Sequence, residues 1–142
     1  MYVVDDLLAA GARHIELPVA SKNPVTILLN ARRLANIVRE ESVDIIHARS
    51  RAPAWVALGA AKRTGIPFVT TYHGVYSDGN SIKTQYNSVM ARGDRVIANS
   101  NFTARHILER YPEAQGRIVT IHRGVDQRVF APEAVEPDRV RA

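Results

Sequence analysis

The amino-acid sequence predicts an α/β fold with a doubly wound parallel sheet, and three observations support this prediction. Short β-branched runs alternate with longer amphipathic segments along almost the whole chain. Glycine or proline punctuates most of the junctions between them. The chain has 142 residues, 46% of them hydrophobic, which is enough for one domain with an ordinary core. Helices that connect parallel strands are expected to cover both faces of the sheet.

The first elements along the chain should be a short helix, a short strand and a long helix. Gly11 closes a helix over residues 3–10, and residues 14–17 alternate as a strand does. Asn23 followed by Pro24 is a typical helix start, with asparagine as the cap and proline in the first turn. Behind this start, apolar residues share one helical face, namely Ile27, Ala31, Leu34 and Val38.

Three strand–helix units and a last strand follow. The strands are expected at residues 43–47, 66–72, 95–99 and 117–121. The helices should begin at Pro53, after the polar loop 77–80, and after a cap at Ser100 or Asn101. They should end near Gly65, Gly93 and Pro112. The apolar face of the middle helix should carry Ile82, Tyr86, Val89 and Met90.

Composition and charge narrow the class of protein. The formal net charge is +5, but basic residues sit at helix ends and faces without interleaved aromatic residues, so no nucleic-acid partner is expected. Phosphate-bearing small molecules or anionic lipids suit the excess charge better. The chain has no cysteine, which excludes disulfides and thiol nucleophiles and fits a reducing compartment. It also has no membrane-length apolar run, and Asp5 and Asp6 argue against a secretory leader, so we expect a cytoplasmic location.

The end of the strand at residues 66–72 is the strongest candidate for a reacting centre. The strand stops at His73 and Gly74, and ligands of open α/β sheets gather at the carboxyl ends of strands. Gly74 would let the backbone turn sharply or approach a ligand closely. His73 is equally compatible with a structural role. The other histidines have no partner at metal-ligand spacing, so the sequence predicts no metal site.

Two further strand ends should deliver polar side chains to the same edge of the sheet. Arg49 and Arg51 follow the strand at residues 43–47, and paired guanidinium groups suit phosphate or carboxylate, although solvated arginines are common. Asn99 and Ser100 follow the strand at residues 95–99, where a helix start favours an anion or an acceptor hydroxyl. Helix capping alone would also explain Ser100.

Several of these segments together resemble a known family. Residues 96–103, residues 118–126, Phe130-Ala131-Pro132 and the corner Thr71-Tyr72-His73-Gly74 are similar to the amino-terminal half of retaining glycosyltransferases of family 4, which have the two-domain GT-B architecture. The resemblance implies a Rossmann-like domain over residues 1–130 and the start of a linker to a second domain over residues 131–142.

The resemblance also implies a reaction. A sugar would pass from a nucleotide-sugar donor to a glycan or lipid-linked acceptor with retention at the anomeric carbon, without a metal or other cofactor. His73, the catalytic candidate, would contact the transferred sugar and stabilise charge at the reacting centre. Substrate would also contact Tyr72 and Gly74 of the same corner and the strand-end residues Arg49, Arg51, Asn99 and Ser100. Arg123 would be structural, because it lies at the turn toward the second domain.

The resemblance is incomplete at both ends. Family members normally begin with a strand and a glycine-rich loop, so the sheet is expected to lack its first strand or strands. The second domain, which makes most donor contacts, is also missing, so the chain alone should be inactive. The missing domain or a strand-donating partner would complete it, and the resemblance suggests a place at the inner membrane in lipopolysaccharide or capsule assembly. The alternatives are a non-catalytic module of the same architecture that binds a glycan, a lipid headgroup or a partner, and a basic nucleic-acid binder.

Overall fold

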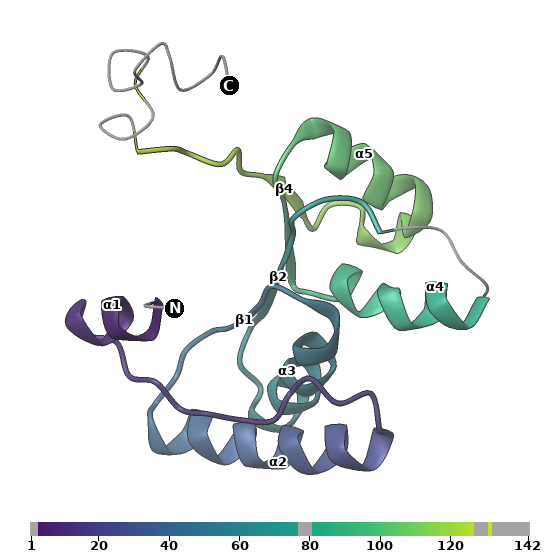
Figure 1. Ribbon diagram of the computed structural model, residues 1–142. Coiled ribbons are helices and arrows are strands. Elements are labelled where there is room, and N and C mark those ends of the chain that lie inside the picture. Colours follow the sequence, from purple (N-terminus) through teal and green to yellow (C-terminus); the bar gives the residue numbers. More distant parts are fainter. Residues whose placement is uncertain (1–2, 77–80, 127–130, 132–142) are drawn as a thin grey trace, which may run out of the picture.

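The computed structural model of the chain, which describes residues 3–76, 81–126 and 131, confirms an α/β fold built on a parallel sheet (Figure 1). Four strands pair in the order in which they occur along the chain. They are β1 (Ile46–Ala48), β2 (Phe68–Tyr72), β3 (Arg95–Ala98) and β4 (Ile118–Thr120). All pairs are parallel, so the carboxyl ends of the four strands lie along one edge of the sheet.

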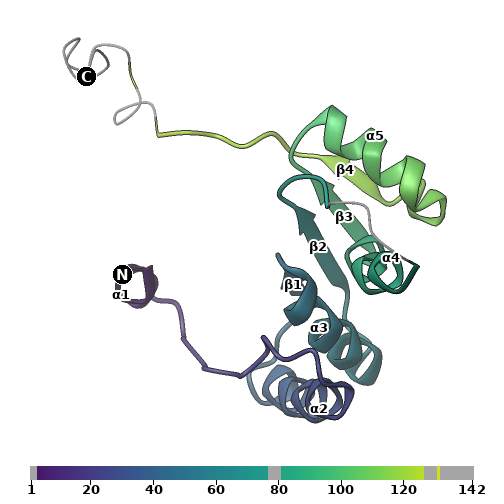
Figure 2. The same ribbon diagram turned by 45° about the vertical axis from the view of Figure 1, so that its right-hand side comes forward.

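Helices cover one face of this sheet in the described residues. The connections are α3 (Arg51–Thr64), α4 (Ser81–Asn87) with the 3₁₀ turn η1 (Ser88–Ala91), and α5 (Asn101–Arg110) with η2 (Pro112–Ala114). Right-handed crossovers between consecutive parallel strands place the connecting helices α3, α4 and α5 on the same side, as Figure 2 shows. We expected helices on both faces of the sheet, but in this part of the chain they cover one face only. Val119 on β4 is accordingly 43% exposed.

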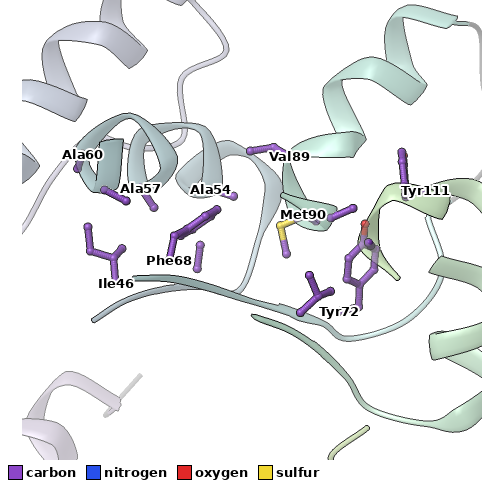
Figure 3. Packing of buried hydrophobic residues seen from close by; sticks show 14 of the residues in the cluster. Ile46, Ala54, Ala57, Ala60, Phe68, Tyr72, Val89, Met90 and Tyr111 are labelled. Carbon is purple, nitrogen blue, oxygen red and sulfur yellow. The ribbon is translucent and has the colours of Figure 1, made fainter. Parts of the chain in front are cut away.

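The core lies between the sheet and these connections. Figure 3 shows Phe68 beneath Ala54 and Ala57 of α3, and Tyr72 beside Met90. The small alanine side chains let α3 approach the sheet closely, and burial along β2 alternates as a sheet with one packed face requires.

Two helices precede the sheet. α1 (Val3–Ala9) lies apart from the sheet (Figure 1), and α2 (Pro24–Glu40) packs against α3. The start of α2 is as expected, because the side-chain oxygen of Asn23 accepts hydrogen bonds from the backbone N–H groups of Val25 and Thr26. α2 and α3 approach closely at Gly59, where an added Cβ would lie 2.8 Å from the Cβ of Ala31.

Several sequence predictions differ from the structure. Residues 14–17 do not form a strand. A strand needs a neighbouring strand to hydrogen-bond with, and this segment pairs with none of the described strands, although its polar and apolar residues alternate. Ile82 is 77% exposed rather than on an apolar face, because the helix ends at Asn87 and tightens into η1. Pro53 is the third residue of its helix. The predicted loop 77–80, and the domain boundary and linker around residues 130–142 except Ala131, lie outside the described residues.

No helix in the described ranges combines the length and the apolar character needed to cross a bilayer.

Candidate functional site

The imidazole of His73 lies between two guanidinium groups at the carboxyl edge of the sheet. Nε of Arg49, just beyond β1, lies 3.1 Å from Nε2 of His73. Nη2 of Arg123, beyond β4, contacts Nδ1 of the same ring. Because the edge of the sheet brings the three strand ends together, residues 50 positions apart meet at one imidazole.

The charges around this ring keep it neutral. Partial burial first, and then the positive charges of Arg123 and Arg49, lower the pKa of His73 below its ordinary value. Burial and Arg49 also lower the pKa of His47, whose Nε2 lies 2.7 Å from Oγ1 of Thr71. Both imidazoles are therefore neutral near pH 7.

This arrangement leaves hydrogen-bond donors of the two guanidinium groups available to an anion. A neutral imidazole has a single acceptor nitrogen, so His73 can accept a hydrogen bond from only one of its two guanidinium neighbours. Neither Arg49 nor Arg123 forms an ion pair with a carboxylate in the described residues, where the recorded pair is Arg13 with Glu41. Two positive charges with unused donors beside a neutral imidazole suit a phosphate or a developing negative charge.

Asn99 fixes the backbone of this corner. Its Nδ2 donates a hydrogen bond to the carbonyl oxygen of His73, 2.9 Å away, and its Oδ1 accepts one from Oγ1 of Thr103 at 2.7 Å. The amide therefore ties the end of β2 to the start of α5, and it holds His73 in place.

Ser100 and Gly74 lie at the same edge with different roles. The Oγ of Ser100 accepts a hydrogen bond from the backbone N–H of Thr103 at 3.1 Å, so it caps α5. Gly74 has no left-handed φ angle, and an added Cβ would meet nothing within 4 Å. The fold therefore does not require glycine at this position.

The structure does not bring Arg51 and Tyr72 together with His73. Arg51 is the first residue of α3, and its Nη1 donates a hydrogen bond to Oδ1 of Asn87 at 2.8 Å. The Tyr72 side chain is buried in the core, where its hydroxyl has no hydrogen-bond partner among described residues and burial raises its pKa. Its position on β2 points it to the packed face, because successive side chains on a strand alternate.

Arg123 is the site residue that sequence reasoning missed, because it was assigned a structural role. The signal that could have found it is its position after β4, whose end lies on the same edge as the other three. No group of three His, Cys, Asp or Glu side chains in the described ranges is arranged to hold a metal ion.

Comparison with known proteins decides the family. The model of Glycosyltransferase Family 4 matches residues 5–129. The chain belongs to glycosyltransferase family 4. The fold is also similar to that of a solved glycosyltransferase from Rickettsia africae, which superposes with a TM-score of 0.76 and 45% identity, over 97% of this chain and 36% of that one.

Several curated relatives of this family 4 chain have names that include the compound D-inositol 3-phosphate. A D-inositol 3-phosphate glycosyltransferase of Catenulispora acidiphila is 28% identical over 69% of the chain and 26% of its own length. The corresponding protein of Nocardiopsis dassonvillei is 29% identical over 63% of the chain and 24% of its own length. The chain thus spans about a quarter of the length of these relatives.

Proposed function

We propose that this chain is the acceptor-side part of a family 4 enzyme that transfers a sugar from a nucleotide-sugar donor to an acceptor with retention at the anomeric carbon. The observation that carries this proposal is the neutral imidazole of His73 between Arg49 and Arg123. A neutral imidazole keeps one N–H that can donate a hydrogen bond to a sugar hydroxyl, and it adds no charge that would oppose positive character at the anomeric carbon.

The guanidinium groups would act on the other partner of the reaction. As the sugar leaves its nucleotide, negative charge grows on the phosphate, and positioned donors that stabilise growing charge lower the barrier. Arg49 and Arg123 supply that positive charge without a metal ion. Asn99 keeps His73 at the reacting position through the carbonyl hydrogen bond, and Gly74 leaves room for the substrate.

The acceptor is the second element of the proposal. The names of two relatives specify D-inositol 3-phosphate, a phosphorylated polyol. The net charge of +5 supports a phosphate-bearing acceptor here too. A glycan or lipid-linked acceptor of lipopolysaccharide or capsule assembly meets the same requirement when it carries phosphate.

The location and partners follow from the same chemistry. We place the chain in the cytoplasm, where nucleotide-sugars are made, and at the surface of an anionic membrane, which attracts basic proteins. A donor-binding domain would complete the active site, because the chain spans about a quarter of its curated relatives.

A chimera tests the transfer reaction. This chain would replace the matching segment of the Rickettsia africae glycosyltransferase, with which it shares 45% identity. Transfer would be measured with a panel of nucleotide-sugars and phosphorylated polyols. We expect turnover by the chimera and none by the chain alone. His73→Ala should lower turnover by about 10²-fold while the unfolding temperature stays unchanged.

The matched control is His14→Ala, which removes an exposed histidine between α1 and α2 and should leave turnover unchanged. Equal turnover of the His73 variant and the unmodified chimera would refute the catalytic assignment.

A binding module without catalysis is the second candidate, and the open edge of β1 favours it. β1 pairs only with β2 in the described residues, and a groove of about 480 Å³ beside it is lined in part by Ile15 and Leu17. A free strand edge next to apolar surface can recruit a strand from another chain. Light scattering tests this candidate, because a concentration-independent monomer would exclude self-association through β1.

A further inference from the structure

Two hollows on the surface share a wall made by Lys22 and Tyr86. The first, which we call the basic pocket, has a volume of about 480 Å³ and is also lined by Ser50, Arg51 and Lys83. The second, the apolar groove, has about 390 Å³ and lies between α2 and α3. Arg49 and His73 line neither hollow, so both are distinct from the candidate site described above.

The basic pocket gathers cations from three separate elements. Lys22 precedes α2, Arg51 begins α3 and Lys83 lies on α4. The guanidinium of Arg51 is held in place by its hydrogen bond to Asn87 and by the ring of Tyr76, whose centroid is 4.6 Å away. That hydrogen bond uses one of five N–H donors. The remaining donors of Arg51 face a pocket that suits a phosphate group.

The apolar groove has a firm aromatic wall. Nε1 of Trp55 donates a hydrogen bond to the carbonyl oxygen of Tyr86 at 3.1 Å, and the two rings lie 6.3 Å apart. The guanidinium of Arg92 sits 5.2 Å from the centroid of Trp55 and further limits its movement. The opposite wall is aliphatic, with Ile27 and Leu28 of α2.

Part of the aliphatic wall of the groove is open to solvent. Leu28, which lines the groove, is 44% exposed. An exposed leucine at the wall of a hollow offers apolar contact area to a ligand.

We propose that the basic pocket and the apolar groove form one binding site for a phosphate-bearing lipid of a membrane. The phosphate lies against Lys22, Arg51 and Lys83, and one hydrocarbon chain follows the groove along Leu28 and Trp55. Because Lys22 and Tyr86 line both hollows, the two are adjacent, and a single amphiphile can reach both. An aliphatic wall accommodates a hydrocarbon chain, whereas a nucleotide or sugar phosphate would leave the groove empty. The proposal concerns binding alone and does not depend on the transfer reaction.

Vesicle binding tests the site directly. The chain would be sedimented with phosphatidylcholine vesicles that contain or lack phosphatidic acid. We expect binding only when phosphatidic acid is present. Lys22→Ala and Lys83→Ala should each weaken it about fivefold, the usual contribution of one basic residue at an anionic surface. The matched control Lys62→Ala removes an exposed lysine that lines neither hollow, and it should weaken binding much less.

A second pair of variants tests the groove. Leu28→Asn should weaken vesicle binding about tenfold because a hydrocarbon contact is lost. Leu29→Asn changes a similarly exposed residue that does not line the groove, and it should have little effect. Thermal unfolding of each variant shows that the fold is retained.

Soluble competitors separate a lipid from a free phosphate. Dihexanoyl phosphatidic acid should displace the chain from vesicles at a much lower concentration than glycerol 3-phosphate, because only the former fills the groove. Equal competition by the two compounds would show a phosphate site without a lipid chain and overturn the proposal. Equal losses in Lys22→Ala and Lys62→Ala would show adsorption through net charge alone and would also overturn it.

Discussion

The side-chain amide of Asn99 donates a hydrogen bond to the carbonyl oxygen of His73, across 2.9 Å and between neighbouring strands. The same side chain accepts a hydrogen bond from Thr103 in the first turn of α5. One residue thus connects the reacting corner, β3 and a helix start. The position of the imidazole depends on this link as well as on its two arginine neighbours.

Asn99→Ala should lower the free energy of unfolding by about 1–3 kcal/mol, because it removes two partly buried hydrogen bonds, one to the carbonyl oxygen of His73 and one from Oγ1 of Thr103. Asn99→Asp keeps the acceptor for Thr103 but cannot donate to the carbonyl of His73, so it should also destabilise the fold. Urea denaturation measures both effects. The exposed neighbour Asn101 provides the control, and an Asn101→Ala cost as large as that of Asn99→Ala would contradict the argument.

The pKa of His73 should be below the ordinary value of about 6.5, and NMR titration of its ring protons would measure it. Because the unfolded chain takes up the proton first as the pH falls, the neutral ring stabilises the fold fully above about pH 6.5, and this contribution is lost below it. Arg123→Gln and Arg49→Gln should each raise the pKa. Arg33→Gln on α2 should not, and a similar rise there would implicate net charge rather than contact.

Replacement by alanine should affect stability differently at two glycines near strand ends. At Gly93 an added Cβ would lie 2.6 Å from the backbone oxygen of Arg95, so Gly93→Ala should destabilise the fold by about 1–3 kcal/mol. Gly74→Ala should leave stability unchanged, because open space surrounds that position. If Gly74 serves ligand approach, the same variant should weaken substrate binding in the active chimera. Thermal unfolding and KM measurements separate these two effects.

The two serines that precede helices offer another matched pair. Ser100 accepts a hydrogen bond from the N–H of Thr103, whereas Ser50 occupies the same position before α3 without a side-chain capping bond. Ser100→Ala should therefore cost about 1 kcal/mol in stability and Ser50→Ala clearly less. Chemical denaturation of both variants checks the order. The reverse order would mean that the capping bond does not stabilise α5.

The middle connection gives a test of packing. Met90 in η1 is fully buried, so Met90→Ala should lower stability by about 2–5 kcal/mol. Ile82→Ala should change stability little, since this side chain is 77% exposed. Thermal denaturation compares the two. A large loss from Ile82→Ala would place that residue on a packed face, as its sequence spacing had indicated.

Local patterns were sufficient to predict where the four strands and most helix ends lie along the chain. β-branched runs located all four strands, and Gly65 ends α3 with a left-handed φ of 77°, as its position predicts. Residues 14–17 show the limit of this reasoning, since a strand also needs a partner that no local pattern specifies.

The site was harder to predict, because it depends on the direction of side chains and on contacts between residues that are far apart in the sequence. Strand ends placed His73, Arg49 and Asn99 correctly along one edge of the sheet. Arg51 is only two residues after Arg49, but the first turn of α3 directs it toward Asn87. The contact of Arg123 with His73 joins residues 50 positions apart, and motif resemblance had assigned Arg123 to a turn.

The strand order has a consequence for how the chain reaches its native state. Each strand pairs with the one synthesised just before it, so no pairing has to wait for a distant segment. Loop closure then costs little entropy at every step, and each strand–helix unit can add to a structured portion already present. We therefore expect the sheet to assemble progressively from β1 to β4 while the ribosome is still extending the polypeptide.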